Sequence, residues 1–143
     1  MSFLTFISSS ERYTQKVAQE FARTLKGDEK ICLIGPLGSG KTSFVRGFAQ
    51  AAGVSPADVM SPTFTLVREY DANGKKLYHV DLYRLEKEDE IFEAGIYDLI
   101  SRPELVLVEW ADRLGKFYPP EAIQIRFAHG AHDLRIIEID REP

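Results

Sequence analysis

The sequence has little of several features that would each indicate a particular class of protein. Its 143 residues include one cysteine, Cys32, so no disulfide can form within the chain. Lysine and arginine number 18 against 22 acidic residues, and this net charge of −4 excludes a broad electrostatic grip on nucleic acid. No run approaches the ~18 apolar residues of a membrane span, and the N-terminus lacks the basic segment of a signal peptide. We therefore expect a cytoplasmic protein without a membrane partner.

The length favours one domain, residues 1–143. Apolar runs at 30–35 and 104–110 predict buried strands in the centre of a sheet. Alternating residues on both sides of "DANGKK" and "HGAHD" predict two β-hairpins. The remaining predicted elements are a short strand at 3–7 and helices at 10–26, 41–52 and 86–94, which glycines 27, 53 and 95 would end. Together they predict an α/β fold, a three-layer sandwich with a mixed, partly antiparallel central sheet.

A glycine-rich segment, "GPLGSGKT", follows the first buried strand directly and opens the second helix. Its spacing, Gly35-x4-Gly40-Lys41-Thr42, matches the Walker A pattern in full, and the strand before it and the helix after it are the expected context. Glycine lets backbone N–H groups converge on phosphates, and the helix N-terminus adds its positive end. The residues expected to contact the nucleotide here are Gly35, Pro36, Leu37, Gly38, Ser39, Gly40, Lys41, Thr42 and Ser43.

Within this segment, two side chains carry the phosphate chemistry. Lys41 is expected to reach the β- and γ-phosphates, and the Thr42 hydroxyl is expected to ligate Mg²⁺. The pattern predicts a P-loop nucleotide-binding protein but leaves the base open.

Two acids at strand ends are candidates for the metal side of the site. Glu109 follows four apolar residues, the better shape for the acid that holds Mg²⁺ directly or through water. Asp81 follows a less apolar run and is interpreted as a second acid near the metal or the attacking water. For each, the alternative is a strand-end carboxylate that faces solvent. The predicted catalytic group is therefore Lys41, Asp81 and Glu109.

Other residues near these motifs have two open interpretations. The hydroxyls of "SPTFT", at Ser61, Thr63 and Thr65, either respond to the γ-phosphate or belong to an ordinary strand entry. Trp110 either stacks on a ligand or packs at the edge of the core. His79 alternates with Asp81 along the strand, so it either orients that acid or packs.

Four segments then carry a family resemblance. In order and spacing, the chain resembles the bacterial TsaE (YjeE-type) ATPases over residues 10–125, at "GPLGSGKTSFVRGF", "SPTFTLVREY", "YHVDLYRL" and "LVEWADRLG". The resemblance implies a P-loop α/β domain that binds ATP and Mg²⁺ and hydrolyses ATP weakly. It also implies action with the partner proteins TsaB and TsaD in making threonylcarbamoyladenosine in tRNAs that read codons starting with A. The tRNA would be reached through that complex.

The resemblance also implies roles for individual residues. Lys41 and Thr42 would take the phosphate and Mg²⁺ roles, and Glu109 that of the metal-side acid. The other positions that it points to are Asp81, Trp110, Thr63, Thr65 and, on weaker matches, Thr14 and Arg135.

Two other classes of function stay open on the residues alone. A small-molecule or nucleoside kinase would use Asp81 as base and Arg84 as clamp, although the arginines are scattered and do not form an Arg-rich lid segment. A non-catalytic nucleotide-sensing module would use the nucleotide only to order a surface.

Overall fold

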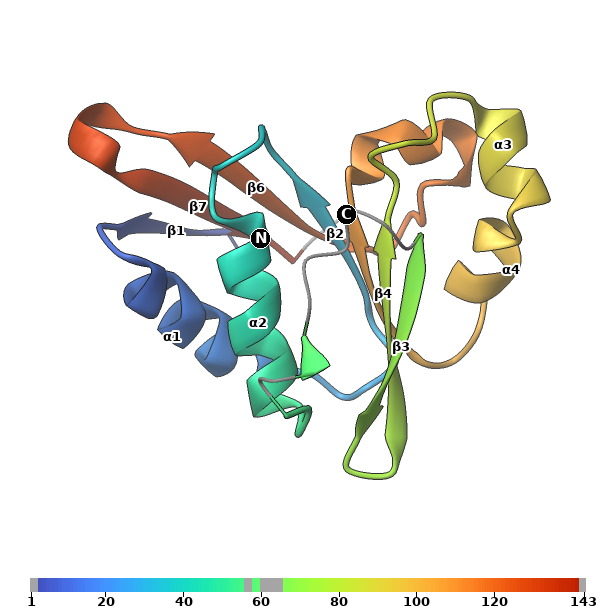
Figure 1. Ribbon diagram of the computed structural model, residues 1–143, viewed down its shortest axis with the longest axis horizontal. Helices are drawn as coiled ribbons and strands as arrows, with labels where there is room; N and C mark the ends of the chain where they lie inside the picture. Colours follow the sequence, from blue (N-terminus) through green and yellow to red (C-terminus); the bar gives the residue numbers. More distant parts are fainter. Residues whose placement is uncertain (1–2, 56–57, 60–65, 142–143) are drawn as a thin grey trace.

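A computed structural model describes residues 3–55, 58–59 and 66–141 of the chain, and its strands form one mixed sheet (Figure 1). The sheet order is β1-β7-β6-β2-β5-β4-β3. The strands are β1 (Phe3–Ser8), β2 (Lys30–Ile34), β3 (Val67–Ala72), β4 (Lys75–Asp81), β5 (Leu105–Glu109), β6 (Ile123–His129) and β7 (Arg135–Asp140). The helices are α1 (Glu11–Ala22), α2 (Lys41–Ala51), α3 (Glu88–Glu93) and α4 (Ile96–Ile100), with 3₁₀ segments η2 (Ala111–Phe117) and η3 (Ala131–Asp133).

The strand directions confirm the predicted mixed sheet. β4, β5, β2 and β6 run parallel to their neighbours in the middle of the sheet. The flanking strands are antiparallel: β3 pairs with β4, and β7 pairs with both β6 and β1. Because the parallel strands point the same way, the residues that follow them meet at one edge of the sheet.

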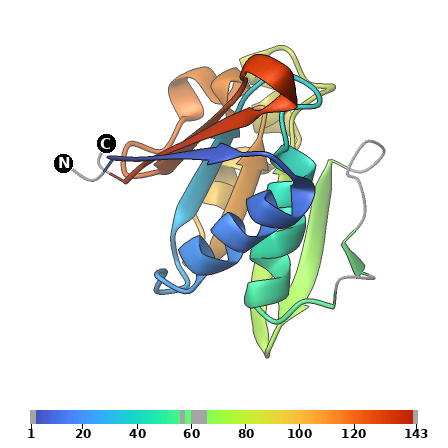
Figure 2. The ribbon, with the colours of Figure 1, turned by 90° about the vertical axis from the view of Figure 1, so that its left-hand side faces the viewer.

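Helices cover both faces of the sheet, which confirms the three-layer arrangement. Figure 2 shows α1 and α2 lying against the same face, and α3, α4 and η2 pack on the other. Along β2, Ile31 and Leu33 belong to the core under α1 and α2, whereas Cys32 belongs to the opposite core. Burial raises the pKa of the Cys32 thiol to about 12, so this cysteine packs as an inert small hydrophobe.

The first helix ends earlier than predicted. Ser10 caps it by accepting a hydrogen bond from the Tyr13 backbone N–H, but the last residue of the helix is Ala22 and it does not continue to residue 26. The Thr24 hydroxyl donates to the Phe21 carbonyl at 2.7 Å. The backbone N–H of Thr24 also donates to that carbonyl, so the chain leaves the helix in a tighter i→i−3 turn.

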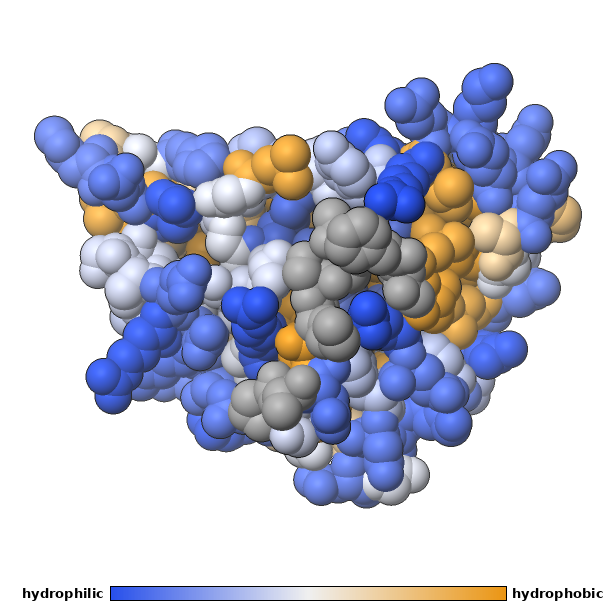
Figure 3. Space-filling model, in the orientation of Figure 1, coloured by the Kyte–Doolittle hydropathy of each residue, from blue (hydrophilic) through white to orange (hydrophobic). Residues whose placement is uncertain are grey.

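The predicted hairpins are confirmed, and the segment between β4 and β5 holds more structure than predicted. The β3–β4 turn is closed by Asp71, which accepts from the Gly74 backbone N–H at 2.8 Å. Ala94 caps α3, and Gly95, with φ of 78°, starts the unpredicted α4. The mostly hydrophilic face in Figure 3 has its largest apolar area beside these two helices. Their exposed aromatics, Phe92 and Tyr97, contact Phe117 of η2.

Gly47 sets the distance between α1 and α2. A Cβ at this position would lie 2.4 Å from the Gln15 carbonyl oxygen. We expect Gly47→Ala to lower the free energy of unfolding by about 1–3 kcal/mol through this clash. Alanine is intrinsically the better helix former by about 1 kcal/mol, so a loss of stability would identify the packing effect. Urea unfolding measures it, with the exposed Arg46→Ala as control. A Gly47→Ala protein as stable as the wild type would contradict the close packing.

Candidate functional site

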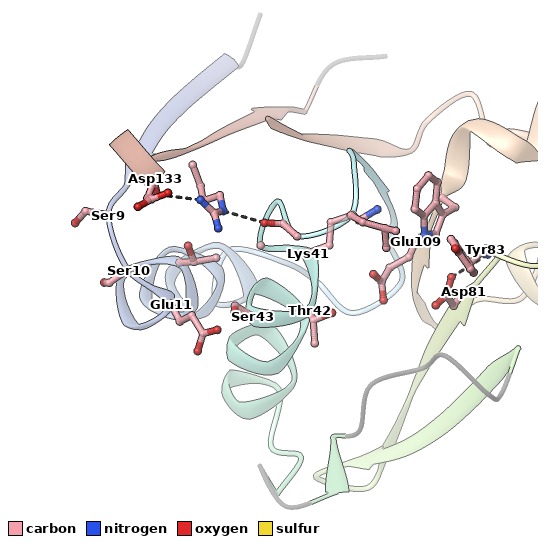
Figure 4. A pocket seen from close by; sticks show the side chains of 16 residues that line it. Ser9, Ser10, Glu11, Lys41, Thr42, Ser43, Asp81, Tyr83, Glu109 and Asp133 are labelled. Atoms are coloured by element: carbon pink, nitrogen blue, oxygen red, sulfur yellow. Dashed lines mark hydrogen bonds between the residues drawn. The ribbon is translucent and has the colours of Figure 1, made fainter. Parts of the chain in front are cut away.

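A pocket of about 500 Å³ lies at the carboxyl edge of the parallel strands (Figure 4). This volume is typical of small-molecule sites. In Figure 4, Ser10 and Glu11 lie on one side of the pocket, Asp81 and Glu109 on the other, and Thr42 between them. The full lining is Ser9, Ser10, Glu11, Thr14, Leu37, Gly38, Gly40, Lys41, Thr42, Ser43, Asp81, Tyr83, Glu109, Trp110, Asp133 and Arg135.

The glycine-rich loop connects β2 to α2 along this pocket. Gly38 and Gly40 have φ of 73° and 104°, the left-handed region that glycine enters without strain. Gly35 has no room for a side chain, because a Cβ there would lie 2.6 Å from the Phe127 carbonyl oxygen. The buried Ser39 hydroxyl donates to the Pro36 carbonyl at 2.6 Å and stiffens the turn. The Walker A glycines therefore meet local steric demands of this loop.

Lys41, the first residue of α2, is 5% exposed. Its Nζ donates to the Gly35 carbonyl at 2.5 Å and lies 3.7 Å from the centre of the Trp110 ring. Burial lowers the pKa of Lys41, whereas the nearby carboxylates of Glu109 and Asp81 act in the opposite direction. The ammonium group thus lies in the wall of the pocket, partly desolvated and within range of two acids.

Trp110 packs at the edge of the core, which is one of the two interpretations that the sequence leaves open, and stacking on a ligand stays a prediction. Its ring packs partly against the core under α3 and α4, and it also faces the Lys41 ammonium group. Arg113 lies 4.9 Å from the ring centre and Tyr83 packs 5.4 Å from it. The backbone at Trp110 is left-handed, with φ of 58°, an uncommon conformation for a bulky residue. Strain of this kind is found most often at functional sites.

Asp81 and Glu109 are paired neighbours at the ends of β4 and β5. Glu109 is 4% exposed, so it does not face solvent. Asp81 is half-buried and accepts from the Tyr83 backbone N–H at 2.9 Å. Burial raises the pKa of Asp81, the Tyr83 N–H lowers it, and the Glu109 charge raises it. Two carboxyls side by side and facing Lys41 can bind a divalent cation or a water molecule.

His79 contacts Glu109 and not the acid on its own strand. Its Nε2 lies 2.6 Å from Glu109 Oε2, and the histidine is 1% exposed. The sequence places His79 on the same side of β4 as Asp81 and suggests that acid as its partner. The register brings both acids near His79, because Glu109 pairs with Asp81, and Asp81 instead accepts from the Tyr83 backbone N–H.

The two weaker matches from the sequence both lie at the pocket. Thr14 of α1 is buried, and its hydroxyl is 2.7 Å from that of Ser8. Arg135 of β7 donates from Nε to the Gly38 carbonyl at 3.0 Å, so the C-terminal hairpin braces the loop. Sequence reasoning missed the lining residues Ser9, Ser10, Glu11, Tyr83 and Asp133, because only the fold brings the start of α1 and the β6–β7 turn to the loop.

Some predicted features are not observed in the structure. Thr63 and Thr65, with Ser61, lie outside the described residues, so their switch-like role stays a prediction. Within the part of the chain that the structure describes, no cluster of three or more His, Cys, Asp or Glu is arranged to hold a metal. A cation here would need ligands from other groups, such as the Thr42 hydroxyl or a phosphate. No helix in the described ranges is long and apolar enough to cross a bilayer.

Comparison with known proteins identifies relatives over most of the chain. The profile of the family "Threonylcarbamoyl adenosine biosynthesis protein TsaE" matches residues 8–137. The "tRNA threonylcarbamoyladenosine biosynthesis protein TsaE" of Aquifex aeolicus is 46% identical over 108 residues, 75% of this chain and 76% of that protein. Its Bacillus subtilis namesake is 37% identical over 124 residues, 87% and 77% of the two chains. The crystal structure of Bacillus subtilis YdiB superposes with a TM-score of 0.76 at 30% identity, covering 96% of this chain and 84% of that one.

Proposed function

The chain belongs to the TsaE family, and we propose that it is a Mg²⁺-dependent ATPase required for the threonylcarbamoyladenosine modification of tRNA. One observation carries the biochemical part of this proposal. The pocket joins a Walker A loop to two carboxyls from neighbouring strand ends, and Lys41 lies close enough for both to act on its charge. Phosphate, metal and water each have a matching group there: a cation, an oxygen donor set and a carboxylate.

In the proposed mechanism, Lys41 exchanges its bond to the Gly35 carbonyl for the β- and γ-phosphate oxygens. Thr42 and Glu109 hold Mg²⁺ or its water shell, and all the donors they offer are oxygens, which suits a hard cation. When bound, Mg²⁺ neutralises charge that develops on the phosphates. Asp81 orients the attacking water, and its raised pKa suits a group that receives a proton. Thr63 and Thr65 are proposed to respond to the γ-phosphate.

The nucleoside end of ATP is proposed to lie between the start of α1 and the β6–β7 turn. Thr14 and Arg135 border that end of the pocket, and adenine as the base follows from the family. Trp110 lies at the phosphate end, over Lys41.

Partner proteins are proposed to control hydrolysis, namely TsaB and TsaD, with the tRNA bound through their complex. The net charge of −4 supports indirect tRNA contact. The cytoplasm is the proposed compartment, since both the tRNA and the ATP pool are found there.

A kinase is the second candidate, and the pocket gives it little support. Arg84, its proposed clamp, is exposed and is not among the described residues that line the pocket. Arg135 does line it, but that side chain bonds to the Gly38 carbonyl. A kinase also needs a second substrate held in line with the γ-phosphate.

The two candidates differ in where the γ-phosphate goes. We expect ATP labelled on that phosphate to yield inorganic phosphate, at a rate that nucleosides and small metabolites do not change. Labelled product on any acceptor would favour the kinase. The Lys41→Ala protein, purified in the same way, measures how much phosphate release or transfer comes from contaminating enzymes.

A further inference from the structure

Buried His79 bonds to Glu109 beside the proposed metal site, and the mechanism above gives His79 no part. We propose that His79 is a positioning residue that fixes the Glu109 carboxylate, so that its second oxygen is presented to Mg²⁺ or the metal's water shell. This inference rests on the proposed function, because Glu109 is taken there as the metal-side acid. His79 itself would touch neither metal nor nucleotide.

The direction of the hydrogen bond follows from the chemistry of the two groups. An ionised carboxylate only accepts, so Nε2 of His79 donates to Oε2 of Glu109 across their 2.6 Å separation. Short hydrogen bonds to a charged acceptor are stronger than hydrogen bonds between two neutral groups. Since Oε2 is engaged in this way, Oε1 is the atom that Glu109 has left for the pocket.

Burial makes the bond restrictive. The side chains of His79 and Glu109 are 1% and 5% exposed, so water does not readily replace either partner. Tyr70 of β3 stacks on the imidazole, with ring centres 6.5 Å apart and planes 27° from parallel. Tyr70 therefore limits how far the imidazole can tilt, and the short bond to Nε2 orients Oε2 of Glu109.

A packing role alone does not explain a histidine at this position. Among the described residues, no hydrogen-bond partner of Nδ1 is found, and an unsatisfied buried polar atom costs about 1–3 kcal/mol. Leu77, two residues earlier on the same face of β4, is fully buried and apolar. An apolar side chain at residue 79 would pack there without that cost. What the imidazole adds is a donor aimed at Glu109.

Ligand-orienting groups of this kind typically change metal affinity by about 10–100-fold when removed. We therefore expect His79→Phe, which keeps the ring shape but removes the donor, to weaken ATP binding in Mg²⁺ by about that factor. In EDTA, the same variant should bind ATP within about twofold of the wild type, because the metal is then absent. His79→Asn, whose amide is too short to reach Glu109, should behave alike. His79→Gln places an amide N–H near the position of Nε2 and should restore most of the affinity.

Trp110 is the only tryptophan in the chain, so its fluorescence reports on this site in each variant. Each protein is titrated with ATP, in Mg²⁺ and in EDTA, and its fold is checked by thermal unfolding. The titrations are repeated in a Glu109→Gln background. There we expect His79→Phe to have little further effect, since the two residues would act through one carboxylate.

Other outcomes would overturn the inference. Equal losses of affinity in Mg²⁺ and in EDTA, or effects that add in the double variant, would show a structural role for His79. If ATP binding by the wild type depends on Mg²⁺ and His79→Phe leaves that binding unchanged, this inference alone would be overturned. A wild type whose ATP binding ignores Mg²⁺ would overturn the proposed function as well.

Discussion

A Lys41→Ala protein is expected to lose ATP affinity by about 100-fold or more and to lose its function in tRNA modification. In the proposed function, the buried Lys41 ammonium is the cation that binds the phosphates, and charge-assisted bonds contribute about 1.5–3 kcal/mol each. Two such bonds lost together correspond to that factor, at 1.4 kcal/mol for each tenfold change. Isothermal titration with ATP measures it without relying on Trp110, whose surroundings the change alters.

Lys116→Ala is the matched control, because Lys116 is an exposed lysine on η2 that does not line the proposed ATP pocket. It should bind ATP like the wild type. A Lys41→Ala protein that binds ATP with wild-type affinity and keeps its fold would show that the loop is not the phosphate site.

The Glu109→Gln protein is expected to bind ATP more weakly in Mg²⁺ and, once saturated, to hydrolyse it about 100–1000-fold more slowly, the rate effect of losing a few kcal/mol of metal-assisted stabilisation. Glutamine has nearly the same shape, and its carbonyl oxygen can still accept from His79, so the fold should be retained. Only the negative charge beside the metal is removed. Phosphate release under saturating ATP measures the loss, with the exposed Glu121→Gln as control.

The same variant separates hydrolysis from sensing. If ATP only orders a surface, Glu109→Gln would support tRNA modification fully while Lys41→Ala would not. We expect both changes to abolish modification, because the proposed function requires turnover. Wild-type levels of modified tRNA with Glu109→Gln would favour the sensing module.

Local sequence patterns predicted the parts of the site that depend on neighbouring residues. The Walker A spacing predicts the loop between β2 and α2, because glycine positions and flanking elements are set within about ten residues. The apolar run that ends at Glu109 predicted a buried strand and an acid at its end. Because parallel strands end at one edge of the sheet, the strand pattern also predicts that Asp81 and Glu109 lie close together, as they do.

Contacts that depend on register could not be predicted in this way. His79 and Glu109 are 30 residues apart, and their contact follows from the pairing of β4 with β5, which one sequence does not define. The bond from Arg135 to the Gly38 carbonyl spans 97 residues and depends on where the β6–β7 hairpin lies. The early end of α1 lies in a tight turn at Thr24 and Leu25, which the helical periodicity of the segment does not reveal.

The central claim is that this pocket hydrolyses ATP under the control of partner proteins. The most direct test is steady-state phosphate release by the purified protein, alone and with TsaB, TsaD and tRNA, using the Glu109→Gln protein as background. We predict slow release by the protein alone and a clear increase when the partners are added. Equal rates with and without the partners, or no release in either case, would contradict the account.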